Sequence, residues 1–212
     1  MRNQGLQSTD IQDLAQFPVA VLDRILGKFG FRPVKPRDIE EFHALADRLI
    51  EGEIASADVL SRVQDWTGRS LHLRRSSGEA DALLASIPLT RAGRDALLAG
   101  RFGFADARRD WVCALDERAH ALLSWGMAGS TPSAQAASVR GLLAGWHAFY
   151  FDTPVYARGR SAAGRRLLPR LGFRPVKPQP GRVPLYESTG FPTHLDRMIQ
   201  AESQLSSREN AA

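Results

Sequence analysis

The sequence predicts a single α/β domain in which helices cover a central sheet. Short apolar runs typical of strands alternate with amphipathic stretches of helical spacing along most of the chain. Glycine stands at several of the boundaries between them, for example at Gly68, Gly100 and Gly172. The chain has 212 residues, of which 43% are hydrophobic. This length and composition suit one hydrophobic core.

The amino-terminal part is predicted to form three helices and one short strand. The first helix spans 11–29 and carries an apolar stripe at helical spacing. A strand follows at 31–34. The second helix begins at Asp38, because Glu41 three residues later completes a capping-box pattern. The third helix covers 56–66 and ends before a glycine.

Strands dominate the middle of the chain, and strands and helices alternate after it. Turn-forming residues at 76–79 predict a hairpin. The predicted strands are 70–74, 82–89, 111–115, 120–127, 154–157, 173–176 and 183–187; the predicted helices are 92–98, 132–149, 161–171 and 195–205. We therefore predict a tail and helix over 1–29, one domain over 30–190, and a helix with a frayed tail over 191–212.

One heptapeptide occurs twice. GFRPVKP spans 30–36 and again 172–178, and the similarity does not extend beyond these residues. Each copy has a glycine turn that leads into a strand, and a proline that ends the strand. We interpret the copies as two similar strand beginnings rather than as tandem domains.

Charge and cysteine content limit the classes of function. The net charge is +5, and three of the 28 basic residues are lysine. This arginine- and alanine-rich composition is typical of a GC-rich, bacterial-like coding sequence. The arginines are scattered without an aromatic stacking motif, which disfavours a nucleic-acid partner. The single cysteine, Cys113, lies among apolar residues and is predicted to be a buried structural thiol. Without a membrane span or signal peptide, we expect a cytoplasmic protein.

Without the short helix at 92–98 and the short strand at 111–115, the predicted order from 31 to 188 is a strand, two helices, three strands, a helix, a strand, a helix and two strands. This order resembles the acyl-CoA N-acyltransferase (GNAT) superfamily. Its members commonly carry an Asn-x-x-Ala-x-x-Leu-Tyr-x-x-x-Gly-Phe pattern, whose positions are here Ser161, Gly164, Leu167, Leu168, Gly172 and Phe173. The resemblance implies a GNAT-like mixed central sheet flanked by helices, to which this chain adds an N-terminal helix.

The resemblance also implies a site for acetyl-CoA or another acyl-CoA. In the family, backbone amides at a helix amino terminus bind the cofactor pyrophosphate. The matching turn follows the strand at 120–127, and it lacks the family's arginine and spaced glycines. A plain Ser/Thr-Pro helix start is the alternative. Arg75 to Ala80 fits the loop pattern literally but lies in the predicted hairpin. The cofactor-binding residues implied are Met127, Gly129, Ser130, Thr131, Ser133, Arg158 and Ser161.

The catalytic residues implied by the resemblance are partly replaced. Leu168 stands where many members have the tyrosine that protonates the leaving thiolate, and leucine carries no proton. Tyr156, on the neighbouring strand, is the candidate substitute, with packing as the alternative. Glu117, which precedes the strand at 120–127, is the candidate general base, with a surface turn as the alternative.

Three functions follow. The leading hypothesis is an acyl-CoA-dependent N-acyltransferase that transfers acetyl to an amine of a small molecule or a protein. The second is a catalytically inactive GNAT-like binding or regulatory protein, and the third is a basic nucleic-acid-associated protein. A homodimer is left open, and no membrane partner is expected.

Overall fold

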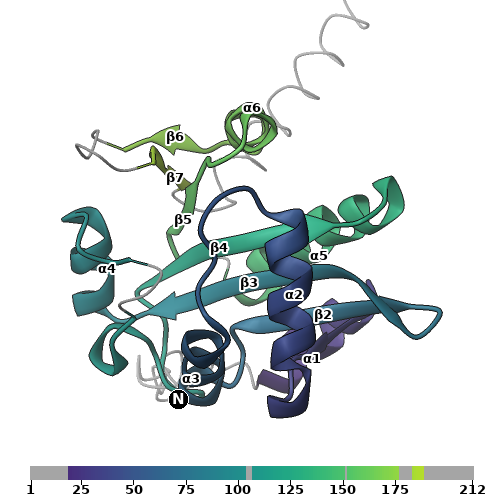
Figure 1. The fold of residues 1–212 in the computed structure, drawn as a ribbon. Helices are drawn as coiled ribbons and strands as arrows, with labels where there is room; N and C mark the ends of the chain where they lie inside the picture. Colours follow the sequence, from purple (N-terminus) through teal and green to yellow (C-terminus); the bar gives the residue numbers. More distant parts are fainter. Residues whose placement is uncertain (1–18, 104–106, 151, 177–182, 189–212) are drawn as a thin grey trace, which may run out of the picture.

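A computed structural model of the chain describes residues 19–103, 107–150, 152–176 and 183–188. Its centre is a seven-stranded sheet in the order β1-β2-β3-β4-β5-β7-β6 (Figure 1). Neighbouring strands are antiparallel except β4 and β5, which are parallel. The strands are β1 (Phe31–Pro33), β2 (Leu71–Ser76), β3 (Glu79–Leu89), β4 (Ala121–Gly129), β5 (Val155–Arg158), β6 (Arg174–Pro175) and β7 (Leu185–Ser188).

Helices cover both faces of this sheet. In Figure 1, α2 and α3 lie in front of the strands, and α1 and α5 lie behind them. The helices are α1 (Val19–Gly27), α2 (Ile39–Leu49), α3 (Ala57–Thr67), α4 (Arg91–Leu98), α5 (Pro132–Phe149) and α6 (Ala162–Arg170), with short 3-10 turns η2 (Pro36–Asp38) and η3 (Arg109–Trp111). The fold is therefore the predicted mixed α/β sheet flanked by helices, with an additional helix at the amino-terminal side.

Alternate strand residues supply two separate cores, because successive side chains of a strand point to opposite faces. Leu83 and Leu123 belong to the core on the α2–α3 face. Leu84 and Leu122 belong to the core on the α1–α5 face. Leu22 and Leu26 join the second core, so α1 packs on the sheet.

The predicted hairpin is confirmed. β2 and β3 pair down to Ser76 and Glu79, and the two turn residues Ser77 and Gly78 have φ values of 54° and 90°. Two consecutive positive φ values are typical of the tight turns that fit the twist of antiparallel strands. The literal match to a phosphate loop at Arg75 to Ala80 thus lies in a hairpin, as expected.

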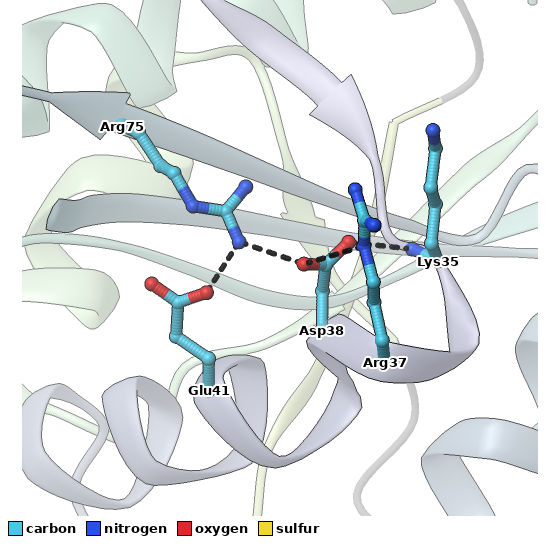
Figure 2. Close-up of polar contacts among 5 residues, drawn as sticks. All are labelled: Lys35, Arg37, Asp38, Glu41 and Arg75. Carbon is cyan, nitrogen blue, oxygen red and sulfur yellow. Dashed lines mark hydrogen bonds and ion pairs between the residues drawn. The ribbon is translucent and has the colours of Figure 1, made fainter. Parts of the chain in front are cut away.

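The predicted capping box at the start of α2 is wrong. The side chain of Asp38 makes no capping bond to α2. Instead its carboxylate accepts from the Lys35 amide at 3.3 Å and from the Arg75 guanidinium at 2.9 Å. Arg75 also contacts the Glu41 carboxylate (Figure 2). An arginine from β2 takes both acids, because the fold brings β2 beside this turn.

The two GFRPVKP copies begin the two edge strands of the sheet. Gly30 and Gly172 both have φ of 84°, in the left-handed region that glycine tolerates. The valines that follow donate to the neighbouring strands alike, Val34 to Leu71 and Val176 to Leu185, each at 2.9 Å. An edge strand tolerates the proline of each copy, since proline has no N–H to donate.

The segment at 111–115, predicted as a small strand or edge, forms no regular strand, and other expectations lie outside the described residues. At 111–115 the structure has the end of η3 and a single bridge between Leu89 and Val112. The expected helix at 195–205, the tail beyond 190 and the first part of the helix at 11–29 fall outside the described ranges. The domain boundaries therefore stay predictions.

Candidate functional site

The parallel strands β4 and β5 separate in the middle of β4. They pair over Leu122↔Val155, Leu123↔Tyr156 and Ser124↔Ala157, and among the described residues β5 pairs with β4 no further. β4 then continues to Gly129 beside β3. Figure 1 shows β5 leaving the direction of β4 towards β7, β6 and α6. The edge of β4 from Trp125 to Gly129 is therefore not paired with β5.

A β-bulge lies at the point of separation. Ser86 pairs with Ser124 and Ala85 pairs with Gly126, so Trp125 is the extra residue. A bulge of this kind turns two consecutive residues towards one face and bends the strand. Trp125 and Gly126 accordingly line the same pocket on the α2–α3 face.

This pocket, which we call the bulge pocket, is partly open to solvent, and the space within it, open solvent included, is about 370 Å³. Most of its lining is apolar, and the guanidinium of Arg160 reaches it from the turn after β5. A Cβ built on Gly126 would lie 3.1 Å from the Cδ1 of Ile50, so a side chain there would reduce the space. The lining residues are Phe42, Ala46, Ile50, Glu53, Ile54, Ala55, Leu60, Leu83, Ala85, Trp125, Gly126 and Arg160.

The turn between β4 and α5 uses most of its backbone amides internally. The Ser130 amide donates to Asp81 at 2.8 Å, and the Ala134 amide donates to the Thr131 hydroxyl at 3.1 Å, which caps α5. Pro132 has no N–H. Gly129 is buried against α5: a Cβ there would lie 2.4 Å from backbone atoms of the helix. The conformation of this turn is therefore explained by the cap and packing of α5, without a bound phosphate.

Two further predicted residues of this turn differ in position. Met127 is half-buried on the α1–α5 face, where it packs against the second core. Ser133, in the first turn of α5, is exposed. Of these two residues, Ser133 is exposed beside the helix amino terminus, whereas Met127 is half-buried against the second core.

The turn between β5 and α6 gathers basic side chains. Arg158 donates to the Val183 carbonyl at 2.7 Å, and Arg160 donates to the Glu53 carbonyl at 2.6 Å across the bulge pocket. Arg165 donates to the Arg160 carbonyl at 2.6 Å. Ser161 caps α6, because its hydroxyl accepts from the Gly164 amide at 2.9 Å. The structure thus brings Arg158 and Ser161 together at a helix amino terminus.

Tyr156 is buried and belongs to a partly buried polar network. Its hydroxyl donates to the Glu187 carboxylate at 2.5 Å and accepts from the Arg94 guanidinium at 3.1 Å. Burial, and then the hydrogen bond that its hydroxyl donates to Glu187, raise the pKa of Tyr156. Sequence reasoning missed Arg94 and Glu187. Glu187 lies directly opposite Tyr156 across β5 and β7, a pairing that the sequence does not specify.

Glu117 and Leu168 take no part in the hydrogen bonds of Tyr156. Glu117 precedes the first residue of β4, at the end opposite the separation, and its carboxylate accepts from the Ala114 amide at 3.1 Å. The structure does not bring it together with Tyr156. Leu168 is 8% exposed and packs in the second core. The position of the family's tyrosine is therefore occupied by a core side chain.

Cys113 is a buried thiol, as predicted. Burial raises its pKa to about 11, which keeps it protonated at neutral pH. Among the described residues, no group of three or more His, Cys, Asp or Glu side chains is arranged to hold a metal ion. In the same part of the chain, no helix is both long and apolar enough to span a membrane.

Comparison with known proteins gives structural matches only. No family model matches the sequence, and no curated protein is similar to it. Among solved structures, a histone acetyltransferase HPA2 and related acetyltransferase from Corynebacterium glutamicum is 17% identical, with 74% of this chain and 92% of that chain covered and a TM-score of 0.45.

Two structurally similar proteins were solved with a CoA ligand. A GNAT-like decarboxylase, GphF, in complex with isobutyryl-CoA is 16% identical, covers 67% of this chain and 69% of that chain, and has a TM-score of 0.47. The N-acetyltransferase YlbP from Bacillus subtilis, in complex with coenzyme A, is 13% identical, covers 74% and 91%, and has a TM-score of 0.43.

The fold itself agrees with the resemblance seen in the sequence. A strand, two helices and a β-hairpin precede β4, a parallel β5 follows across a long helix, and β6 and β7 complete the sheet. The chain thus has the mixed sheet, flanked by helices, of a divergent protein with the GNAT fold.

Proposed function

We propose that the protein is an acyl-CoA-dependent N-acyltransferase whose cofactor lies where β4 and β5 separate. The observation that carries this proposal is the edge of β4 from 125 to 129, which pairs with β3 but not with β5. A strand edge offers backbone donors and acceptors to an extended ligand. The pantetheine arm of CoA is extended and contains amide groups, so it is a suitable partner for this edge.

We place the acyl group and its thioester at the bulge pocket. Its apolar lining suits a short acyl chain beside Trp125 and Gly126. In the transfer, the amine nitrogen attacks the thioester carbon, the C–N bond forms and the C–S bond breaks. The amine loses a proton, and the CoA thiolate leaves and takes one from a protein group or water. Holding the two reactants in this geometry supplies much of the rate.

We place the phosphates of CoA at the basic turn after β5. Arg158, Arg160 and Arg165 surround the amino terminus of α6, which carries a partial positive charge. Each of them donates at least one hydrogen bond to a carbonyl oxygen. A phosphate would offer these guanidinium groups a stronger, charge-assisted bond.

Tyr156 is the proposed proton donor, acting together with Glu187. Tyr156 pairs with Leu123, one position before the strands separate. Because its pKa is raised, Tyr156 holds its proton at neutral pH. To protonate the leaving thiolate, its hydroxyl would release the hydrogen bond to Glu187, and the phenolate would regain a proton from water. Glu117 as the base would act from the other end of β4, and Glu187 is the better placed carboxylate. The acceptor remains an amine of a small molecule or a protein.

A binding protein with a GNAT-like fold and no catalysis is the second candidate. It is favoured by the buried Leu168 at the tyrosine position and by the amides of Ser130 and Ala134, which are already bonded. Under this reading CoA or a related nucleotide still binds at the separation of the strands, but no acyl group is transferred.

Thermal unfolding with acetyl-CoA tests the cofactor site. A ligand at 100 times its Kd stabilises the folded state by about 2.7 kcal/mol, which raises the Tm by roughly 5–10 °C for a chain of this size. The decisive variants are Ser161→Asp and Ser161→Asn. Both residues cap a helix well, but only aspartate adds a negative charge at the phosphate position. We expect Ser161→Asp to weaken acetyl-CoA binding about 10-fold or more, and Ser161→Asn to keep it.

The outcomes separate the candidates. No stabilisation of the wild-type protein by millimolar acetyl-CoA contradicts both CoA readings. Equal affinities of the two Ser161 variants would show that the turn before α6 does not bind the phosphates. Stabilisation without release of free CoA thiol, across a panel of amines, favours the binding protein over the enzyme.

A further inference from the structure

A second pocket lies on the opposite face of the sheet, between α1, α5 and the strands β2, β3 and β4. It is partly open to solvent, and the space within it, open solvent included, is about 300 Å³. We call it the Arg69 pocket. Its lining residues are Leu22, Leu26, Arg69, His72, Leu84, Ser86, Leu122, Gly141, Leu142, Gly145, Trp146 and Tyr150. It shares no lining residue with the bulge pocket, so whatever binds here is independent of the proposed CoA site.

Four polar side chains in this lining are almost completely buried. The exposed fractions are 5% for Arg69, 3% for His72, 5% for Trp146 and 6% for Tyr150. Within the described part of the chain, one nitrogen or oxygen of each has no hydrogen-bond partner: Arg69 Nε, His72 Nε2, Trp146 Nε1 and Tyr150 OH. Folded proteins rarely leave buried polar atoms unpaired, so such a group points to a missing partner.

Arg69 also lacks a counter-charge. Its guanidinium donates to two neutral groups, the carbonyls of Ala114 at 3.1 Å and Glu117 at 2.6 Å. Among the described residues, no carboxylate lies within ion-pair distance of it: the Glu117 carboxylate accepts from the Ala114 amide, and Asp23 lies 3.5 Å from His72 Nε2. A buried cation ordinarily has an anion beside it, because removal from water is costly.

The unpaired atoms are mainly donors. Indole and guanidinium nitrogens carry hydrogen and accept nothing. Burial raises the pKa of Tyr150 to about 12, so its hydroxyl keeps its proton and can donate. His72 can donate from Nε2 as well, although Asp23 is its nearest partner. A ligand that satisfies these groups must therefore accept hydrogen bonds, and beside Arg69 it should carry negative charge.

The geometry points to a binding site for a small monovalent anion in the Arg69 pocket. The anion accepts from Arg69 Nε, Trp146 Nε1 and Tyr150 OH, and any short apolar part lies against Leu22 and Leu142. A short-chain carboxylate and a halide share this chemistry. Neither the proposed acyl transfer nor the separation of β4 and β5 requires such a site.

Indole signals in ¹H–¹⁵N spectra test the site directly. The chain has four tryptophans, and the signal absent from the Trp146→Phe variant identifies Trp146. Sodium propionate and sodium chloride are titrated separately. We expect the Trp146 signal to shift and saturate with at least one of them, and the anion that saturates at the lower concentration is the better ligand. If neither anion moves the Trp146 signal, the proposal is overturned, and the donors bind water or nothing.

Tyr150→Phe provides the specific test, with Tyr186→Phe as its matched control. Loss of the Tyr150 hydroxyl removes one donor, so the anion concentration for half-saturation should rise about 10-fold, while Tyr186→Phe leaves it unchanged. In anion-free buffer, Tyr150→Phe should unfold at or above the wild-type temperature, since it removes an unpaired buried hydroxyl. An unchanged titration in Tyr150→Phe, or a strongly lowered Tm without anion, would show that the hydroxyl has another partner and would contradict the site.

Discussion

At the scale of single residues, close backbone approach shapes the turn between β4 and α5. Gly129 looked like a position where a cofactor phosphate approaches the backbone. In the structure the atoms that approach it are those of Ala134 and Gln135, at 2.4 Å from a built Cβ. A glycine in a suspected phosphate loop can therefore be required by the helix that follows.

Gly129→Ala should be strongly destabilising. Because the clashing atoms are backbone, they cannot move aside without shifting the start of α5, and we expect a loss of about 3 kcal/mol or more in the free energy of unfolding. Urea unfolding followed by circular dichroism measures this. Gly164→Ala in α6 is the control: its Cβ meets only the Ser161 hydroxyl at 3.3 Å and the Gly159 Cα at 4.0 Å, so the change should stay within about 1 kcal/mol of wild type. Similar losses in both variants would contradict this account.

At the scale of elements, two polar networks join segments that are distant in the sequence. Arg75 of β2 pairs with Asp38 and Glu41 at the start of α2, on the surface (Figure 2). Tyr156 of β5, itself buried, joins the partly exposed Arg94 of α4 to the partly exposed Glu187 of β7. The difference in burial decides which of the two networks contributes more to stability.

Tyr156→Phe should lower the free energy of unfolding by about 1–3 kcal/mol, because Glu187 and Arg94 lose their common partner away from water. Arg75→Ala should lower it by less than about 1 kcal/mol, because an exposed ion pair gains little over its hydration. Chemical denaturation of the two variants side by side gives the comparison. A larger loss from Arg75→Ala than from Tyr156→Phe would show that the surface network contributes more to stability than the Tyr156 network.

At the scale of the whole molecule, the sheet separates two pockets of different character. The bulge pocket lies with the α2–α3 core, and the Arg69 pocket lies with the α1–α5 core. The additional helix α1 supplies Leu22 and Leu26 to the second pocket. Its role is thus to cover a face of the sheet and to enclose the buried donors there.

Alkaline pH should weaken the fold through Tyr150. Its pKa is about 12 in the folded protein and about 10 in an unfolded chain. The stability from the protonated hydroxyl is therefore complete below pH 10 and is lost as the pH rises towards 12. At pH 11, wild type should lose about 1.4 kcal/mol more than Tyr150→Phe, relative to pH 8. Urea unfolding of both proteins at these two pH values checks the difference; equal losses would show that Tyr150 ionises at its ordinary pH.

The sequence by itself determined most of the secondary structure and the order of elements. Hydrophobic spacing is local, so 132–149, the hairpin and the two strands at the GFRPVKP repeats could be predicted from it. It failed at 111–115, where a short apolar run forms only one bridge, and at Asp38, whose carboxylate is taken by Arg75. In both places a distant segment outweighs the local preference.

Only the tertiary structure decided which polar groups meet. Glu187 faces Tyr156 because β7 enters the sheet beside β5. Arg69 meets the carbonyls of Ala114 and Glu117, and no carboxylate of the described residues lies within ion-pair distance of it. Spacing along the chain does not specify which groups surround Tyr156 or Arg69, since hydrogen bonds and charges act through space once the core has formed. The sequence thus set the frame of strands and helices, and burial in the assembled sheet decided where chemistry can occur on it.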